Sequence, residues 1–197
     1  SAMQKGLQTR LSVYLILKSL INGKSTYDKL FKKEIEKNKY STRDINFIQS
    51  VVLSSLRHNI QVKKIIDKFA NKKINEDTYI LLLGAITQLV FLNFKNYAVV
   101  NSSVELSKEK KIKTYSGFIN GILKNIIKEK ESLKKTKITL NDLPKWFVNK
   151  ITKKNLDKIF YIINSITEKP DLHLVFKNNY FLKNFLKERR NEDIKTS

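Results

Sequence analysis

Long segments of this chain contain almost no residue that would interrupt a helix. The 197 residues include only two prolines and five glycines, and the segments between them are rich in Leu, Ile, Phe and Lys. Proline and glycine are the residues that disfavour a helix interior most strongly. Hydrophobic residues make up 41% of the chain, which is enough to bury a core. The sequence therefore predicts an all-α fold.

Apolar residues recur three and four positions apart through most of the chain, which is the spacing of one helix face. Asn22-Gly23 suits a helix C-terminus, Ser41 with Asp44 forms a capping-box pattern, and Asn75 suits an N-cap. We expect helices over residues 5–21, 27–38, 41–57, 62–70, 98–110 and 114–131, and one capped by Asn75 that runs through residues 79–91.

The segment 79–91 is apolar nearly all round, which predicts a helix at the centre of the fold. Gly84 and Ala85 in its middle would let a neighbouring helix approach closely. The longest apolar run, 79–94, is interrupted by Thr87 and Gln88 and is shorter than the roughly 20 residues of a membrane span. No signal peptide is visible. We expect a soluble cytoplasmic protein with no membrane partner.

The charge balance is strongly basic. With 39 basic and 18 acidic residues the net charge is +21, which favours a polyanionic partner. Between positions 108 and 158, fifteen lysines stand against five acidic residues. Only five basic residues are arginine, and Asn and Ile are abundant, so a compositional bias of the genome is the alternative explanation. Nucleic-acid binding is the favoured interpretation.

Residues for catalysis and metal binding are scarce. The chain has no cysteine, which excludes disulfides, thiolate metal sites and cysteine nucleophiles within these residues. His58 and His173 are far apart and have no other ligand-type neighbours. No strand is followed by a glycine-rich loop of the kind that cradles phosphates. The sequence predicts no catalytic residue and no metal site, so this chain by itself is not expected to be an enzyme.

After Ser132 the pattern changes. A lysine-rich connection leads to the segment LPKWFVNKI, a predicted helix over 155–166, a short predicted strand at 172–177 and a brief amphipathic helix over 180–187. A lone strand cannot form a sheet, so we interpret it as the first strand-helix piece of a truncated next domain. The predicted division is 4–137, a connecting helical segment 138–170, and an incomplete domain 171–197. Ser1, Ala2 and Met3 look like a vector remnant.

Five separated segments stand out between about residues 10 and 130: TRLSVYLIL, DINFIQSVVLSSLR, LLLGAITQLVF, YAVVNSSVELSK and FINGILK. Together they resemble the NusB-like domain, an all-helical RNA-binding module. That domain occurs alone in NusB antitermination factors and as the front end of RsmB/Sun-type ribosomal RNA cytosine-5 methyltransferases. The resemblance implies a NusB-like helical bundle over 4–137.

The C-terminal segments resemble the methyltransferase branch. LPKWFVNKI and EKPDLHLVFKN are similar to the stretches that lead from the helical domain into the catalytic one. Lys124 is also methyltransferase-like, whereas Gly121 is antiterminator-like. The resemblance implies an RNA-binding N-terminal domain that helps a methyltransferase domain in cis engage small-subunit ribosomal RNA. S-adenosylmethionine is then expected only in the missing catalytic domain. The alternatives are a NusB-like antitermination factor acting with a ribosomal protein, and a protein interaction module.

Six basic residues are the predicted RNA-binding site. Lys108, Lys110, Lys111 and Lys113 fall at the junction of two predicted helices, and with Arg10 and Lys124 they could form one phosphate-binding surface. A merely solvated face is the alternative.

Four further polar or aromatic residues have two interpretations each. Asn101 and Asn120 lie on apolar helices, and hydrogen bonding between helices is favoured over base recognition. Tyr97 and Tyr115 could stack on unpaired bases, but aromatic residues at helical spacing are more often part of the core.

Overall fold

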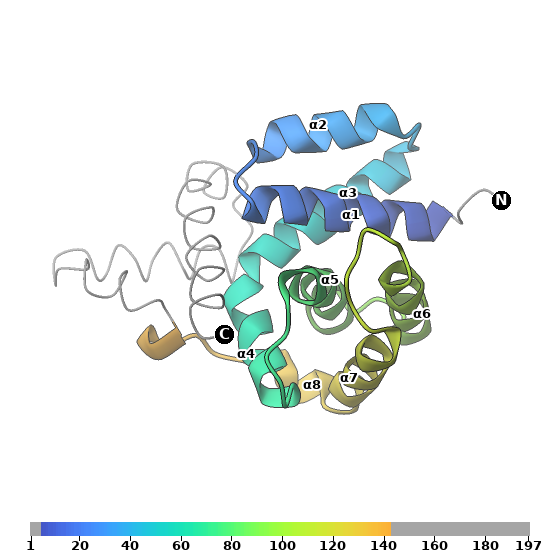
Figure 1. Cartoon of the computed structure of the whole chain (residues 1–197). Helices are drawn as coiled ribbons and strands as arrows, with labels where there is room; N and C mark the ends of the chain where they lie inside the picture. The colour runs from blue at the N-terminus through green and yellow to red at the C-terminus, as the bar shows by residue number, and fades with distance from the viewer. Residues whose placement is uncertain (1–4, 143–197) are drawn as a thin grey trace, which may run out of the picture.

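The computed structural model describes residues 5–142 of the chain (Figure 1). Regular structure within this range is entirely helical, which confirms the predicted all-α fold. The elements are α1 (Lys5–Ile21), α2 (Tyr27–Lys37), α3 (Thr42–Arg57), α4 (Asn59–Phe69), α5 (Glu76–Ile86), the π-helix η1 (Thr87–Phe91), α6 (Asn96–Ser107), α7 (Ser116–Lys128), α8 (Lys130–Leu133) and the 3₁₀-helix η2 (Leu140–Asp142).

Three helix ends lie where local sequence signals predict them. The Asp44 N–H donates to Ser41 Oγ over 3.2 Å, and the Ser41 N–H donates back to Asp44 Oδ2 over 3.4 Å, which completes the capping box. Asn75 Oδ1 caps α5 by accepting from the Thr78 N–H at 2.9 Å. After α1, Gly23 takes a φ of 65°, the left-handed conformation that ends helices. These contacts confirm the predicted caps.

The fourth helix begins earlier than predicted. The sequence predicts a start at residue 62, whereas α4 begins at Asn59. His58 is both the C-cap of α3 and the N-cap of α4, so α3 and α4 are separated by a single residue. No local capping signal marks this start, because the N-cap residue His58 makes no side-chain cap hydrogen bond.

α5 lies at the centre of the bundle, as predicted. Every residue from Ile80 to Val90 is buried, and α1, α3, α4, α6 and α7 all contact α5 (Figure 1). α1 crosses α5 at Gly84, where a Cβ would lie 3.6 Å from Val13 Cγ1. That is ordinary van der Waals contact, so the close approach is real but a methyl group would still fit.

The end of α5 widens into a π-helix. The Leu92 N–H donates to the Thr87 carbonyl at 3.0 Å, and the Phe94 N–H donates to the Gln88 carbonyl at 2.9 Å. Asn93 follows with a φ of 53°. π turns often occur at functional or strained positions because they insert one residue into the helix. Here the π turn follows directly after α5, and Gln88 within it bonds to Arg10 of α1.

The chain after α8 is bonded to α4. Gln61 Nε2 donates to the Thr136 carbonyl at 2.7 Å, and Lys64 Nζ donates to the Lys137 carbonyl at 2.8 Å. Lys64 Nζ also lies 3.0 Å from Asp142 Oδ2. We call residues 134–142 the C-terminal strap. The predicted segment LPKWFVNKI, the strand at 172–177, the predicted domain 171–197 and His173 lie outside the described residues, and the domain boundaries stay predictions.

Candidate nucleic-acid interface

α6 and α7 form a hairpin whose outer side carries two exposed tyrosines. Tyr97 is 82% exposed and Tyr115 is 84% exposed. The interpretation that they pack in the core is therefore wrong. The buried residues of α6 are Val99, Ser102, Ser103, Leu106 and Ser107, and Tyr97 is not among them. Tyr115 is the N-cap residue of α7 and precedes the first buried position of that helix.

The loop between α6 and α7 brings the predicted lysines to the surface. Lys108, Lys110, Lys111 and Lys113 are all exposed, whereas Ile112 between them is buried at 4% exposure. Lys108 pairs with Glu105 at 2.9 Å, so part of its charge is offset. Among the described residues, the other three have no acidic partner. The buried Ile112 fixes the loop and leaves these lysines facing solvent.

Two residues at the start of α5 hold the backbone of this loop at Lys113. Asp77 Oδ2 accepts from the Lys113 N–H at 2.9 Å, and Asn75 Nδ2 donates to the Lys113 carbonyl at 2.7 Å. Asp77 also pairs with Lys18 of α1 at 3.0 Å. Burial alone would raise the pKa of Asp77, but the Lys113 N–H and Lys18 outweigh it and lower that pKa. Asp77 is therefore an anionic anchor of the lysine loop.

The solvent side of α7 is unusually open. Gly117, Gly121 and Lys124 are exposed and follow one another at helical spacing. A Cβ at either glycine would meet nothing within 4 Å. Lys124 has no acidic partner among the described residues. We call Tyr97, Lys110, Lys111, Lys113, Tyr115 and Lys124 the hairpin surface.

Arg10 is not a free cation of the lysine loop. Its Nε donates to Gln88 Oε1 at 2.8 Å, and its guanidinium carbon lies 4.9 Å from the centre of the Phe47 ring. Phe47 stacks on Phe94, three residues before Tyr97. Burial lowers the pKa of the Arg10 guanidinium, although an arginine stays charged. Arg10 thus lies towards the Tyr97 end of the hairpin and is held by packing contacts.

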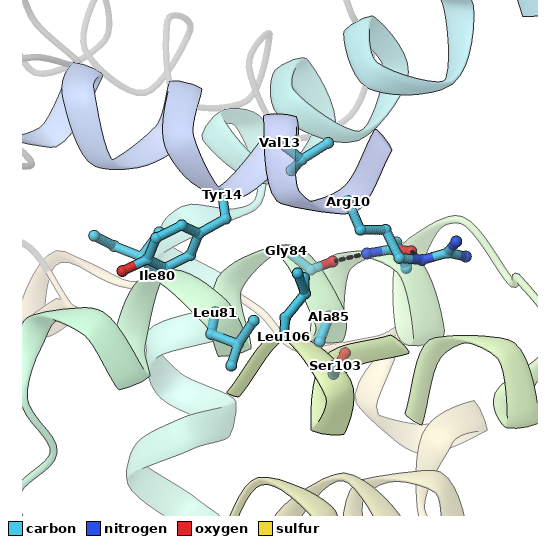
Figure 2. Close-up of a pocket in the computed structure, with 10 residues that line it drawn as sticks. Arg10, Val13, Tyr14, Ile80, Leu81, Gly84, Ala85, Ser103 and Leu106 are labelled. Atoms are coloured by element: carbon cyan, nitrogen blue, oxygen red, sulfur yellow. Dashed lines mark hydrogen bonds between the residues drawn. The ribbon is translucent and has the colours of Figure 1, made fainter. Parts of the chain in front are cut away.

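A small cavity lies between α1, α5 and α6 (Figure 2). Arg10 stands at one end and Tyr14 at the other, with Gly84, Ser103 and Leu106 along its walls. Its volume is about 10 Å³, room for roughly one water molecule. The cavity is too small for a substrate or a cofactor.

The two asparagines on the hairpin differ in exposure. Asn101 is exposed on α6, and Asn120 is half-buried on α7. Among the described residues neither amide has a hydrogen-bond partner, so the predicted role in joining the helices stays a prediction.

His58 is buried and has a structural setting. Its ring stacks on Phe91 with centroids 3.9 Å apart, and its Nδ1 lies 2.6 Å from Gln61 Oε1. Burial lowers the pKa of His58 to about 4, and the charge of Arg57 adds to this, while the Gln61 bond opposes it. No group of three or more His, Cys, Asp or Glu side chains within residues 5–142 is placed to hold a metal ion.

Sequence reasoning missed three residues that shape this region. Asn75 was recognised as a helix cap but not as a loop anchor, and neither Asp77 nor Gln88 was selected. Gln88 did carry a signal, because it is a lone amide in an apolar helix and a buried amide requires a partner. Asp77 carried none, since acidic residues are ordinary in the first turn of a helix.

Comparison with known proteins places this fold in a family. Residues 7–128 match the model of the NusB family. The transcription antitermination protein NusB of Finegoldia magna is 29% identical over 136 residues, covering 66% of this chain and 98% of that protein. The ribosomal RNA small subunit methyltransferase B of Pasteurella multocida is 26% identical over 151 residues, covering 74% of this chain.

The two kinds of relative differ in length. This chain spans 98% of the antitermination protein but only 33% of the methyltransferase. A crystal structure of the antitermination factors NusB and NusE in complex with dsRNA matches with a TM-score of 0.55 at 23% identity, over 64% of this chain and 98% of that one. That likeness shows the shared fold. No helix in residues 5–142 combines the length and the apolar character needed to cross a membrane.

Proposed function

The chain belongs to the NusB family, and on that premise we propose that it is an RNA-binding domain whose hairpin surface contacts the RNA. One observation carries the proposal. The two large apolar side chains that stand out as exposed in residues 5–142 are Tyr97 and Tyr115. Tyr115 directly follows the loop of exposed lysines, and Tyr97 lies at the opposite end of α6, two residues after the exposed Lys95. Exposed aromatic rings next to cations are the components of a surface that binds unpaired nucleotides.

The two kinds of side chain do different work in this proposal. Lys110, Lys111 and Lys113 meet phosphates, which releases counterions and carries no sequence information. Tyr97 and Tyr115 stack on unpaired bases, which a phosphate contact cannot do. Asp77 and Asn75 hold the loop in place before RNA arrives, so less conformational entropy is lost on binding.

The finer role that we propose is the RNA-binding front domain of a ribosomal RNA cytosine-5 methyltransferase-like protein. The match to the methyltransferase relative extends over 151 residues, more of this chain than the antitermination relative covers. In this role the RNA is small-subunit ribosomal RNA, and S-adenosylmethionine binds to a catalytic domain in cis and to none of the residues described above.

An antitermination factor is the second candidate. The chain spans almost the whole of the Finegoldia magna antitermination protein, at the higher identity of the two relatives. A partner in that role would be a ribosomal protein bound together with the RNA. A natural reading frame that continues past position 197 into a region with paired cysteines would decide for the methyltransferase role, and joint binding of RNA and a ribosomal protein would decide for antitermination.

The stacking contribution is tested with the double variant Tyr97→Ala, Tyr115→Ala. Each lost stack should cost about 1–3 kcal/mol of binding to unpaired RNA, while binding to a perfect duplex should change little. Fluorescence anisotropy with single-stranded and duplex RNA measures both. Both side chains are exposed, so the fold should survive, and circular dichroism checks this. Unchanged affinity for unpaired RNA would remove the central observation behind the proposal.

The phosphate contribution is tested with Lys110→Glu plus Lys124→Glu, measured against salt concentration. We expect weaker binding to every RNA and, on a single strand, a salt slope reduced by about 0.7 for each phosphate that the variant no longer neutralises. Lys135→Glu plus Lys137→Glu is a matched control, because both lysines are exposed and lie in the C-terminal strap, which is bonded to α4. Equal losses of affinity in the two double variants would mean that RNA binding depends on the net charge of the protein and not on the position of the lysines.

A further inference from the structure

A second basic surface lies on α2, on the other side of the bundle from α7 (Figure 1). Residues four apart on a helix form a row along its surface. One outer row of α2 alternates acidic, basic and acidic residues, whereas the neighbouring row is wholly basic. The first row is Asp28, Lys32 and Glu36, and the second, here called the α2 lysine row, is Lys29, Lys33 and Lys37. All six residues are exposed.

The inner side of α2 fixes which way these rows face. Glu34 is only 9% exposed and accepts from Ser12 Oγ of α1 at 2.9 Å and from Asn38 Nδ2 at 3.2 Å. Tyr40 completes the contact, with its hydroxyl 2.6 Å from Ser12 Oγ. A buried carboxylate needs such partners, and their directions set the rotation of the helix. The one acidic residue on this side is turned inward, so it does not face the lysine row.

The lysines of the row keep their charge available. An ion pair on the outer side of α2 joins Lys32 to Glu36 at 4.0 Å and lies within the mixed row. Lys29, Lys33 and Lys37 have no acidic partner among the described residues. Compositional bias alone would distribute lysines over both outer rows, whereas here one row is self-compensating and the other is uniformly positive.

We propose that the α2 lysine row binds the phosphate backbone of RNA as a second contact, separate from the hairpin surface. This inference rests on the proposed RNA-binding function. The row spans about 12 Å along the helix, and one nucleic-acid strand carries a phosphate about every 3 Å along its axis, so each lysine can meet a different phosphate. The aromatic residues of α2 face inward, with Tyr27 buried and Phe31 half-buried. The contact therefore reads no bases.

Two contacts on opposite sides of the bundle select for the size of the RNA. A domain of this length is roughly 35 Å across, so a short oligonucleotide reaches only one of the two surfaces. A longer folded RNA can follow the domain and meet both. The domain then holds two segments of one RNA, and the gain comes from the high effective concentration of the second segment.

The test compares two RNAs and two triple variants. The probes are an unpaired RNA of about eight nucleotides and a folded RNA of roughly 40 nucleotides. The variant is Lys29→Gln, Lys33→Gln, Lys37→Gln, and the control is Lys72→Gln, Lys135→Gln, Lys137→Gln, which removes the same charge elsewhere. All these side chains are exposed or half-exposed, so both proteins should fold.

We expect the α2 variant to bind the long RNA at least tenfold more weakly, with a salt slope lower by about 2 to 3, and to bind the short RNA as well as the parent chain does. Equal losses of affinity in the α2 variant and the control would overturn the inference. An unchanged affinity for the long RNA would overturn it too. So would an α2 variant that no longer binds phosphatidylserine vesicles but still binds the long RNA as the parent chain does. The hairpin variants described above separate the two proposals. If they bind the short RNA as tightly as the parent chain does, the proposed function fails, and not only the inference about the α2 lysine row.

Discussion

α2 and the α6–α7 hairpin both present lysines to solvent, but they are attached to the core by different forces. α7 buries four large aliphatic side chains, Ile119, Ile122, Leu123 and Ile126. α2 buries only Tyr27 among its apolar residues and relies on the carboxylate of Glu34. Each fully buried aliphatic side chain contributes about 1.5–3 kcal/mol, so the hairpin should be held far more strongly.

In both regions, different contacts supply the stability of the attachment and the orientation of the helix. Apolar contacts are non-directional. The hairpin adds directional bonds at its loop, through Asp77, Asn75 and Thr78, and one at the start of α6, where Asn96 Oδ1 accepts from Lys130 Nζ.

The other apolar side chains of α2 that pack on the core, Leu30, Phe31 and Ile35, are only half-buried, and hydrogen bonds to Glu34 fix the rotation of the helix. Both arrangements point lysines outward. α2 should open locally before the hairpin does, because local opening follows the amount of buried apolar contact.

The largest expected effect is a pH dependence at the junction of α3 and α4, where His58 lies. Gln61 donates to the Thr136 carbonyl, so its Oε1 is the acceptor for His58, and the neutral ring carries its proton on Nδ1. The pKa of His58 falls to about 4 in the folded protein, from an ordinary value of 6.5. The unfolded chain therefore takes up the proton first as the pH falls. The stability from the neutral ring is complete above pH 6.5 and is lost between pH 6.5 and about 4.

Chemical unfolding at pH 7 and pH 4.5 measures this loss, which should be about 2.5 kcal/mol. His58→Phe keeps a ring against Phe91 but cannot be protonated, so its stability should fall less over the same range. Carboxylates that titrate near pH 4 act equally in both proteins. Hydrogen exchange should show the C-terminal strap loosening before α2. Identical pH slopes for the two proteins would contradict this account of His58.

The next effect should act on α2 and spare the hairpin. Glu34→Ala removes the acceptor shared by Ser12 and Asn38, and losing a buried hydrogen-bond partner costs about 2 kcal/mol. Native-state hydrogen exchange should show faster opening of α2 and no change in α7. Glu36→Ala is the control, since its pair with Lys32 is exposed and 4.0 Å long and should contribute less than about 0.5 kcal/mol. Equal effects of the two substitutions would mean that Glu34 does not anchor α2.

The sequence predicted the features of the fold that depend on neighbouring residues. The bounds of α1, the capping box at Ser41 and the cap at Asn75 follow from contacts three or four positions apart. The central position of α5 followed from its apolar surface, which needs no knowledge of its partners. The exposed lysines of the α6–α7 loop were also found, because lysines in a short connection have nowhere to be buried.

What escaped prediction depends on residues far apart in the chain. Arg10 is 78 residues from Gln88, and Asp77 is 36 residues from Lys113. No local pattern encodes either pair, so Arg10 was grouped with the lysines although it is held against Gln88 and Phe47. Tyr97 was assigned to the core because helical spacing alone does not say which stripe of α6 faces α5, and Tyr115 because its place as the N-cap residue of α7 was not predicted. The π turn at Thr87–Phe91 was not predicted either.

The smallest effect should stabilise the hairpin without touching α2. Gly121 lies in the middle of α7, where a Cβ would meet nothing within 4 Å. Alanine restricts the unfolded chain and favours the helix, so Gly121→Ala should raise the free energy of unfolding by about 0.5–1 kcal/mol. Gly23→Ala is the opposing control, because the φ of 65° at Gly23 is strained for alanine and the protein should lose stability. If Gly121→Ala left the free energy of unfolding unchanged while hydrogen-exchange protection in α2 rose, α2 and the hairpin would be coupled and would not open independently.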